Sequence, residues 1–193
     1  MSSRSALSSA RLNNKSPFPS AKSSNTWCSA QSWIFTTHSS RFSKPGDYHS
    51  FTLSSFPFFL ILGKDFKIRA FHNVCRHRAY TITKKESGSS AVLGCRYHGW
   101  SYNARGELVK APHFENVPGF DKSQNGLFEI ATVVTGDGLV FVNLDAGTPG
   151  IEPDLTGLEH FMKSHRLRGK RCMWVSGGAV DKAFNWKSAG ELT

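Results

Sequence analysis

Two short motifs in this chain each combine a thiol with an imidazole. Residues 75–77 read Cys-Arg-His, and residues 95–98 read Cys-Arg-Tyr-His. Together they can give one iron two thiolate ligands and a second iron two imidazole ligands. This mixed set raises the potential of a binuclear iron–sulfur centre above that of an all-thiolate cluster. The residue types and spacing therefore predict that Cys75, His77, Cys95 and His98 hold such a centre.

Zinc is the main alternative, because it also accepts four ligands drawn from Cys and His. Zinc knuckles more often place two Cys at one short spacing and two His at the other, whereas each motif here is mixed. Gly94 precedes the second motif and Gly99-Trp100 follows it, which favours a loop that folds closely around a cofactor. A colourless, redox-silent interaction module stabilised by zinc stays open, as do four unrelated core side chains.

The surrounding residues resemble the Rieske [2Fe-2S] domain in the large subunit of the Rieske non-haem iron oxygenases. Residues 71–79 (FHNVCRHRA) match its first cluster loop, and residues 95–102 (CRYHGWSY) match its second. The resemblance covers roughly residues 33 to 146, and the stretches 41–48 and 119–128 look closest to the choline-monooxygenase-like branch. It implies a Rieske-type [2Fe-2S] cluster as cofactor, with Arg78, Tyr97, Gly99 and Trp100 as further cofactor-binding residues.

Within this resemblance, Arg78 and Trp100 are expected to orient the loops, although Trp100 is equally compatible with simple core packing. Tyr97 and Ser101 are the hydroxyl groups predicted to reach the cluster sulfurs. Relatives of the oxygenase type make few such hydrogen bonds, which implies a potential at the low end of the Rieske range of roughly −150 to +300 mV.

Short strands separated by turn residues predict a mainly all-β fold, an antiparallel sandwich or small barrel. The resemblance adds a cluster-binding subdomain at about residues 70–112. Segment 155–167 has the pattern of a short amphipathic helix. Strands are expected at 50–54, 57–62, 66–71, 91–94, 100–103, 107–110, 127–135 and 139–144, with turns at 63–65, 104–106 and 136–138.

The amino-terminal segment differs from the rest of the chain. The net charge of the 193 residues is +10, and residues 1–46 contain no Asp or Glu. Residues 1–32 are basic and Ser-rich, which predicts a disordered tail. This tail also resembles an organelle transit peptide. The other interpretations are a solvated tail and an altered form of a helix found in relatives.

Cys28 and Cys172 are too few for a secreted disulfide framework. The cytoplasm is therefore the expected compartment, or a mitochondrion or other organelle if the tail is a transit peptide.

Two classes of partner are not expected. No apolar run approaches the roughly 20 residues that a membrane-spanning helix needs. The basic residues form no periodic stripe with aromatics, which argues against a nucleic-acid partner despite the charge.

The resemblance also shows what this sequence does not contain. Rieske oxygenases act on substrate at a mononuclear iron held by two His and one carboxylate, and in the family that site follows an Asn-Trp-Lys signature. Here the signature is residues 185–187, and no His occurs after His165. Residues 33–146 are therefore predicted to form the Rieske domain, and 147–193 a linker and truncated lead-in to a missing catalytic domain.

These observations predict a carrier of single electrons, the redox half of an oxygenase-type oxidoreductase, and assign no catalytic residue to this chain. A flavin or ferredoxin-type reductase is the expected donor, and a mononuclear iron oxygenase domain is the expected acceptor. A catalytic mono-oxygenase with a choline-like substrate, encoded in a longer form, is the alternative.

Overall fold

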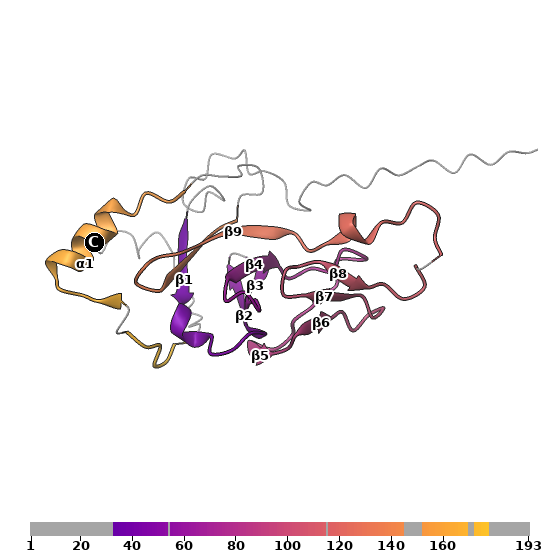
Figure 1. Ribbon diagram of the computed structural model, residues 1–193, viewed down its shortest axis with the longest axis horizontal. Helices are drawn as coiled ribbons and strands as arrows, with labels where there is room; N and C mark the ends of the chain where they lie inside the picture. Colours follow the sequence, from indigo (N-terminus) through magenta and orange to yellow (C-terminus); the bar gives the residue numbers. More distant parts are fainter. Residues whose placement is uncertain (1–32, 54, 115, 145–151, 170–171, 178–193) are drawn as a thin grey trace, which may run out of the picture.

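The computed structural model describes residues 33–53, 55–114, 116–144, 152–169 and 172–177. A seven-stranded sheet and a three-stranded sheet form most of this part of the chain. Figure 1 shows the smaller sheet at one end of the molecule and the helix α1 (Thr156–Ser164) at the other. The predicted mainly β, antiparallel fold with a short helix towards its carboxyl end is confirmed.

The larger sheet is antiparallel throughout, in the order β1-β10-β9-β4-β3-β2-β5. The smaller sheet has the order β6-β7-β8. The strands of the larger sheet are β1 (Ile34–His38), β2 (Asp47–Leu53), β3 (Phe56–Leu62), β4 (Ile68–His72), β5 (Ser87–Ser89), β9 (Glu129–Val134) and β10 (Leu139–Asn143). Those of the smaller sheet are β6 (Val92–Gly94), β7 (Ser101–Asn103) and β8 (Leu108–Lys110), and short 3-10 helices span Ser39–Arg41 and Lys122–Asn125.

Strand β3 is buried on both faces, which explains its continuous apolar sequence. Phe59 and Ile61 pack in a core that contains both cysteines of the two motifs. Phe58 and Leu60 pack in a second core with residues of β9 and β10. Successive side chains of a strand point to opposite faces, so β3 separates the core beside the cysteines from the core of the larger sheet.

The β3–β4 turn is longer than the sequence predicts. The predicted turn ended at Asp65, but Phe66 has a positive φ of 57° and its N–H donates to the Gly63 carbonyl at 3.0 Å. Arg69 reaches back to the Asp65 carboxylate across this turn. Strand β4 therefore begins at Ile68, two residues later than expected.

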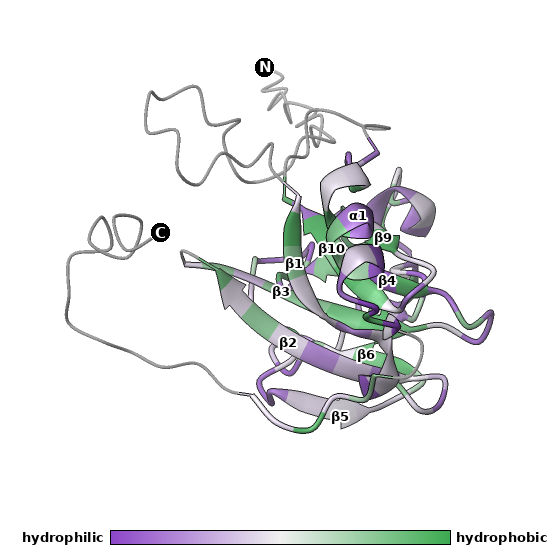
Figure 2. Cartoon of the chain, turned by 90° about the vertical axis from the view of Figure 1, so that its left-hand side faces the viewer, coloured by the Kyte–Doolittle hydropathy of each residue, from purple (hydrophilic) through white to green (hydrophobic). Residues whose placement is uncertain are grey.

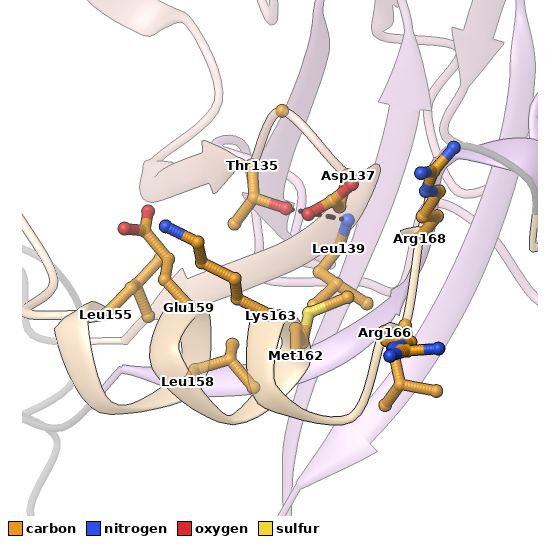
Figure 3. Close-up of a pocket in the computed structure, with 12 residues that line it drawn as sticks. Thr135, Asp137, Leu139, Leu155, Leu158, Glu159, Met162, Lys163, Arg166 and Arg168 are labelled. Atoms are coloured by element: carbon orange, nitrogen blue, oxygen red, sulfur yellow. Dashed lines mark hydrogen bonds between the residues drawn. The ribbon is translucent and has the colours of Figure 1, made fainter.

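Helix α1 lies within the predicted segment 155–167 and packs beside the β9–β10 turn (Figure 3). Strand β10 is coloured largely hydrophobic in Figure 2, whereas α1 is mixed. None of the residues of α1 is buried. An open hollow of about 770 Å³ separates α1 from the turn, lined by residues that include Asp137, Lys163 and Arg168.

Several expectations lie outside the described residues. These are the tail at 1–32, the end of the predicted domain at 145–146, the start of the linker at 147–151 and the signature at 185–187. Within the part of the chain that the structure describes, no helix is long and apolar enough to cross a membrane.

Candidate metal centre

The first motif forms a tight loop after β4. The Cys75 N–H donates to the Tyr80 carbonyl at 2.8 Å, and the Ala79 N–H donates to the Cys75 carbonyl at 2.8 Å. Ala79 has a φ of 53°, a left-handed conformation that is uncommon for a residue with a side chain. The loop thus reverses the chain while its backbone groups stay paired.

Asn73 closes the base of this loop. Its side-chain oxygen accepts hydrogen bonds from the N–H groups of Ile82, at 3.1 Å, and Thr83, at 2.9 Å. Its amide nitrogen donates to the Thr83 carbonyl at 2.9 Å. Asn73 is only 3% exposed, so the two ends of the loop are joined by a buried, well-satisfied polar group.

The second motif repeats the same backbone turn between β6 and β7. The Cys95 N–H donates to the Trp100 carbonyl at 2.8 Å, the Gly99 N–H donates to the Cys95 carbonyl at 3.0 Å, and Gly99 has a φ of 74°. In both loops the Cys thus bonds the residues four and five positions later. His77 is the third residue of the first turn, and His98 is the fourth residue of the second turn. The two imidazoles therefore leave the same type of backbone turn at different positions.

The two loops place sulfur inside and nitrogen outside. Cys75 and Cys95 are free thiols, each 3% exposed, in one core cluster. The rings of His77 and His98 are half-buried, with centroids 4.6 Å apart and planes at 73°. The structure therefore brings together the two cysteines, and separately the two histidines, that the sequence singled out.

Aromatic rings hold the two imidazoles unequally. Trp100 is buried and stacks on His77, with centroids 5.0 Å apart and planes 11° apart. Phe114 meets the His77 ring edge-on at 5.4 Å. The Tyr97 ring lies 3.9 Å from the His98 ring, and the Tyr97 side chain is 52% exposed. Both imidazoles are half-buried, but His77 contacts a buried tryptophan and a phenylalanine, whereas His98 contacts an exposed tyrosine.

A buried ring nitrogen fits a metal ligand. His98 Nδ1 is buried and has no hydrogen-bond partner, which is costly for a polar atom unless something else binds it. No three or more His, Cys, Asp or Glu side chains in the described residues gather as they would around a single metal ion. A zinc site needs three or four ligands about one point, whereas a two-iron cluster needs only two protein ligands at each iron. Two thiols and two imidazoles provide the donor set of a Rieske-type [2Fe-2S] cluster.

The hydroxyl that reaches a cysteine sulfur belongs to Tyr102, not to either of the two predicted hydroxyl residues. The Tyr102 Oη lies 3.3 Å from Cys75 Sγ and accepts the Arg76 N–H at 3.1 Å. Of the predicted hydroxyl donors, Ser101 instead donates to the Gly99 carbonyl at 3.0 Å. The alternation of side chains along β7 could have identified Tyr102 from the sequence, because it is the one residue of the three in this strand that faces the core.

Burial keeps both groups of this pair protonated in the absence of metal. It is the largest cause of the raised pKa of Cys75, and Cys95 nearby acts in the same direction. Burial also raises the pKa of Tyr102, with Cys75 as the next cause. A thiol must lose its proton to bind iron, so Tyr102 stays a hydroxyl donor while the metal compensates the thiolate charge.

Arg76, which the sequence did not single out, ties the first loop to a neighbouring segment. The Arg76 guanidinium lies 3.9 Å from the centre of the Phe128 ring and donates to the Gln124 carbonyl at 3.5 Å. Arg78 is exposed. At Gly99 an added Cβ would come within 3.3 Å of Pro112, so this turn leaves little room for a side chain.

Comparison with known proteins agrees with this geometry. The family model described as Rieske [2Fe-2S] domain matches residues 32–121. The chain is 33% identical over 165 residues to the chlorobenzene dioxygenase subunit alpha of Cupriavidus sp. (strain PS12), covering 83% of this chain and 36% of that one. It is 34% identical over 129 residues to the carnitine monooxygenase oxygenase subunit of Escherichia coli (strain K12), covering 67% and 34%.

Solved structures of Rieske oxygenases are also similar to this chain. The apo form of a quaternary ammonium Rieske monooxygenase superimposes with a TM-score of 0.63 at 32% identity, covering 70% of this chain and 39% of that chain. Naphthalene 1,2-dioxygenase with indole bound superimposes with a TM-score of 0.58 at 32% identity, covering 69% and 29%.

The chain therefore contains a Rieske [2Fe-2S] domain, whose cofactor is a Rieske-type [2Fe-2S] cluster. The curated relatives it matches are large or oxygenase subunits of such enzymes, and the chain spans little more than a third of their length.

Proposed function

We propose that this chain carries single electrons as the redox part of an oxygenase-type oxidoreductase. The observation that supports it most is the pairing of two buried thiols with two imidazoles, one of which has a buried nitrogen without a partner. Cys75 and Cys95 would hold one iron, and His77 and His98 the other. When bound, the cluster accepts and releases one electron without a change of ligands.

The protein's own residues control where that electron can pass. The core around the two cysteines excludes water from the sulfur side. The half-buried imidazoles form the edge nearest to solvent. Trp100 fixes the plane of His77 by stacking, and the Tyr102 hydroxyl would donate to the Cys75 sulfur once this sulfur is a thiolate. Electrons would therefore enter and leave through the histidine side.

The partners follow from the relatives, which are components of oxygenases. A flavin or ferredoxin-type reductase would supply the electron, and the mononuclear iron of an oxygenase domain would receive it. A longer form of this protein acting as a mono-oxygenase on a quaternary amine is the second candidate. Its support is the TM-score of 0.63 with a quaternary ammonium monooxygenase, although the chlorobenzene dioxygenase subunit matches a larger share of this chain.

Visible absorption and reduced-state EPR spectra of the full chain, reconstituted anaerobically with iron and sulfide, test the electron-carrying proposal. We expect a brown protein whose average g value lies below that of all-cysteine clusters, because imidazole replaces thiolate at one iron. His98→Ala and Cys95→Ser should abolish this signal. Cys172→Ser should leave it intact, since Cys172 is exposed and distant in sequence from both loops. A colourless protein that holds one zinc would overturn the proposal.

A further inference from the structure

The helix α1 is not held in place by its own packing. It has nine residues, and none of them is buried. An isolated helix shorter than about 12–15 residues is only marginally stable in water. The open hollow of about 770 Å³ lies between α1 and the β9–β10 turn (Figure 3). Contacts outside the helix must therefore keep α1 beside this turn.

The chain after α1 is attached to the β9–β10 turn at Gly169. This glycine is buried, and an added Cβ would overlap Asp137 of the turn, so the two segments approach closely. The Cys172 N–H donates to the Gly169 carbonyl at 2.8 Å. This first attachment lies beyond the end of α1 at Ser164.

Trp174 makes a second attachment, to the 3-10 helix Ser39–Arg41. The centre of its ring lies 4.6 Å from the Arg41 guanidinium, and its backbone N–H donates to Ser40 Oγ at 2.9 Å. Tryptophan is the best aromatic partner for a cation. Trp174 is 37% exposed, whereas its neighbours Met173 and Val175 are 78% and 90% exposed. Trp174 is therefore the residue of these three that faces the rest of the domain.

The larger sheet fixes Arg41 from its other side. The Arg41 guanidinium donates to Thr37 Oγ1 of β1 at 3.3 Å and lies 5.8 Å from the centre of the Phe51 ring of β2. His49 Nε2, also in β2, donates to the Arg41 carbonyl at 3.2 Å. The cation that Trp174 contacts is thus already held by two strands.

A chain of hydrogen bonds joins the two attachments. His38 Nε2 lies 3.0 Å from the Asp137 carbonyl, which can only accept, so this nitrogen carries the proton of the neutral ring. His38 Nδ1 then accepts from the Ser40 hydroxyl at 2.9 Å. The Ser40 oxygen accepts the Trp174 N–H in turn. The contact at Trp174 therefore leads back to the turn on which Gly169 packs.

We propose that the described residues 152–169 and 172–177 form a flap beside the β9–β10 turn, and that Trp174 is the latch that holds this flap closed. Segments with few buried apolar groups open locally while the rest of a protein stays folded. The exposed α1 meets this condition, and β3, buried on both faces, does not. Loss of the latch should therefore release α1 as a unit and leave both sheets folded. The inference goes beyond the electron-carrying function and does not depend on it.

Hydrogen exchange measured by mass spectrometry on the reconstituted full chain tests the latch. The amides of α1 should exchange about 10-fold faster in Trp174→Ala than in wild type, because the cation–π contact and the packing of the ring are lost. The amides of β3 should keep their wild-type rates. Met173→Ala is the matched control, since it removes the neighbouring, more exposed side chain, and it should change neither set of rates.

A second variant tests the contact itself. Arg41→Gln should speed exchange in α1 about 3-fold in wild type and have no further effect in Trp174→Ala, because two residues that act through one contact are not additive. Full additivity would overturn the latch. So would equal α1 rates in Trp174→Ala and Met173→Ala, or unprotected α1 amides in wild type, where the flap would already be open. Faster exchange of β3 in Trp174→Ala would contradict the flap, because Trp174 would then stabilise the whole fold.

Discussion

Among single residues, Tyr102 has a special position because its hydroxyl is oriented by the backbone. The Arg76 N–H donates to the Tyr102 oxygen at 3.1 Å, and Cys75 Sγ lies 3.3 Å from the same oxygen. Once Cys75 is a thiolate it has no proton to donate, so the Tyr102 hydroxyl donates to the sulfur. The side chain is fully buried, and a hydrogen bond is stronger electrostatically in a medium of low dielectric constant. Such a bond stabilises the more negative, reduced form of a cluster ligated by that sulfur.

Replacing Tyr102 with Phe should therefore lower the reduction potential. Loss of about 1 kcal/mol of preferential stabilisation corresponds to roughly 40 mV for a one-electron couple. The potential can be measured by a redox titration followed by visible absorption. Ser101→Ala is the matched control, because that hydroxyl bonds the Gly99 carbonyl, and its potential should stay near the wild-type value. An unchanged potential in Tyr102→Phe, with an intact EPR signal, would show that the bond is not made to a cluster ligand.

Residue types identified the two motifs from the sequence, but not their supporting contacts. A thiolate and an imidazole at short spacing carry their chemistry in the sequence itself. Tyr102 and Asn73 support the loops only because the fold brings them to Cys75 and to the base of the first loop. Arg76 and Arg78 are indistinguishable by type, and it is the neighbouring Phe128 that makes Arg76 the anchored one.

At the scale of elements, the smaller sheet is joined to the larger one through the turn between β7 and β8. Gly106 in this turn has a φ of 77°, and an added Cβ would overlap the ring of Phe71, a residue of β4 that is 1% exposed. The Gly106 carbonyl also accepts the Leu127 N–H at 2.7 Å. The turn is thus fixed between the two sheets and has no room for a side chain.

Gly106→Ala should therefore destabilise the protein by roughly 2–4 kcal/mol, from the left-handed conformation and overpacking together. Urea unfolding followed by circular dichroism measures the change. Gly136→Ala, in the β9–β10 turn, is the control, since an added Cβ there meets nothing within 4 Å. If the two variants unfold at the same urea concentration, neither the left-handed conformation nor the overlap with Phe71 costs much stability.

Elements with a strong hydrophobic pattern were predicted well, and those without one were not. The apolar run of β3 and the Gly-Asp-Gly turn before β10 carried clear signals. Strand β5, Ser87–Ser89, has no apolar residue and is exposed along its length. It is a strand because β2 supplies its backbone partners, which no local pattern reveals. Phe66 lies in the turn although its residue type favours a strand.

For the whole molecule, the position of β3 between two cores couples the cluster end to the larger sheet. The core around Cys75 and Cys95 and the core beneath β9 and β10 share this strand. Strand β4 pairs with β3 and leads from the larger sheet into the first cluster loop. A perturbation at the end of β4 should therefore affect the stability of the whole described fold.

His72 lies at that end of β4 and should make the molecule sensitive to acid. It is 2% exposed, and burial lowers its pKa from 6.5 to about 4. The unfolded chain therefore binds more protons than the folded chain between these values, so stability is full above pH 6.5 and falls as the pH drops towards 4. Between about pH 7.5 and pH 5 the expected loss from this residue is roughly 2 kcal/mol.

Urea unfolding of wild type and His72→Gln at these two pH values measures that contribution. Gln stays neutral and keeps hydrogen-bonding groups, so the variant should lose less stability on acidification, by about the same 2 kcal/mol. Both proteins carry the same cluster, and any acid lability of the cluster itself is common to the pair. Equal losses in the two proteins would mean that His72 is protonated without unfolding, and that the end of β4 admits a charge which its burial argues against.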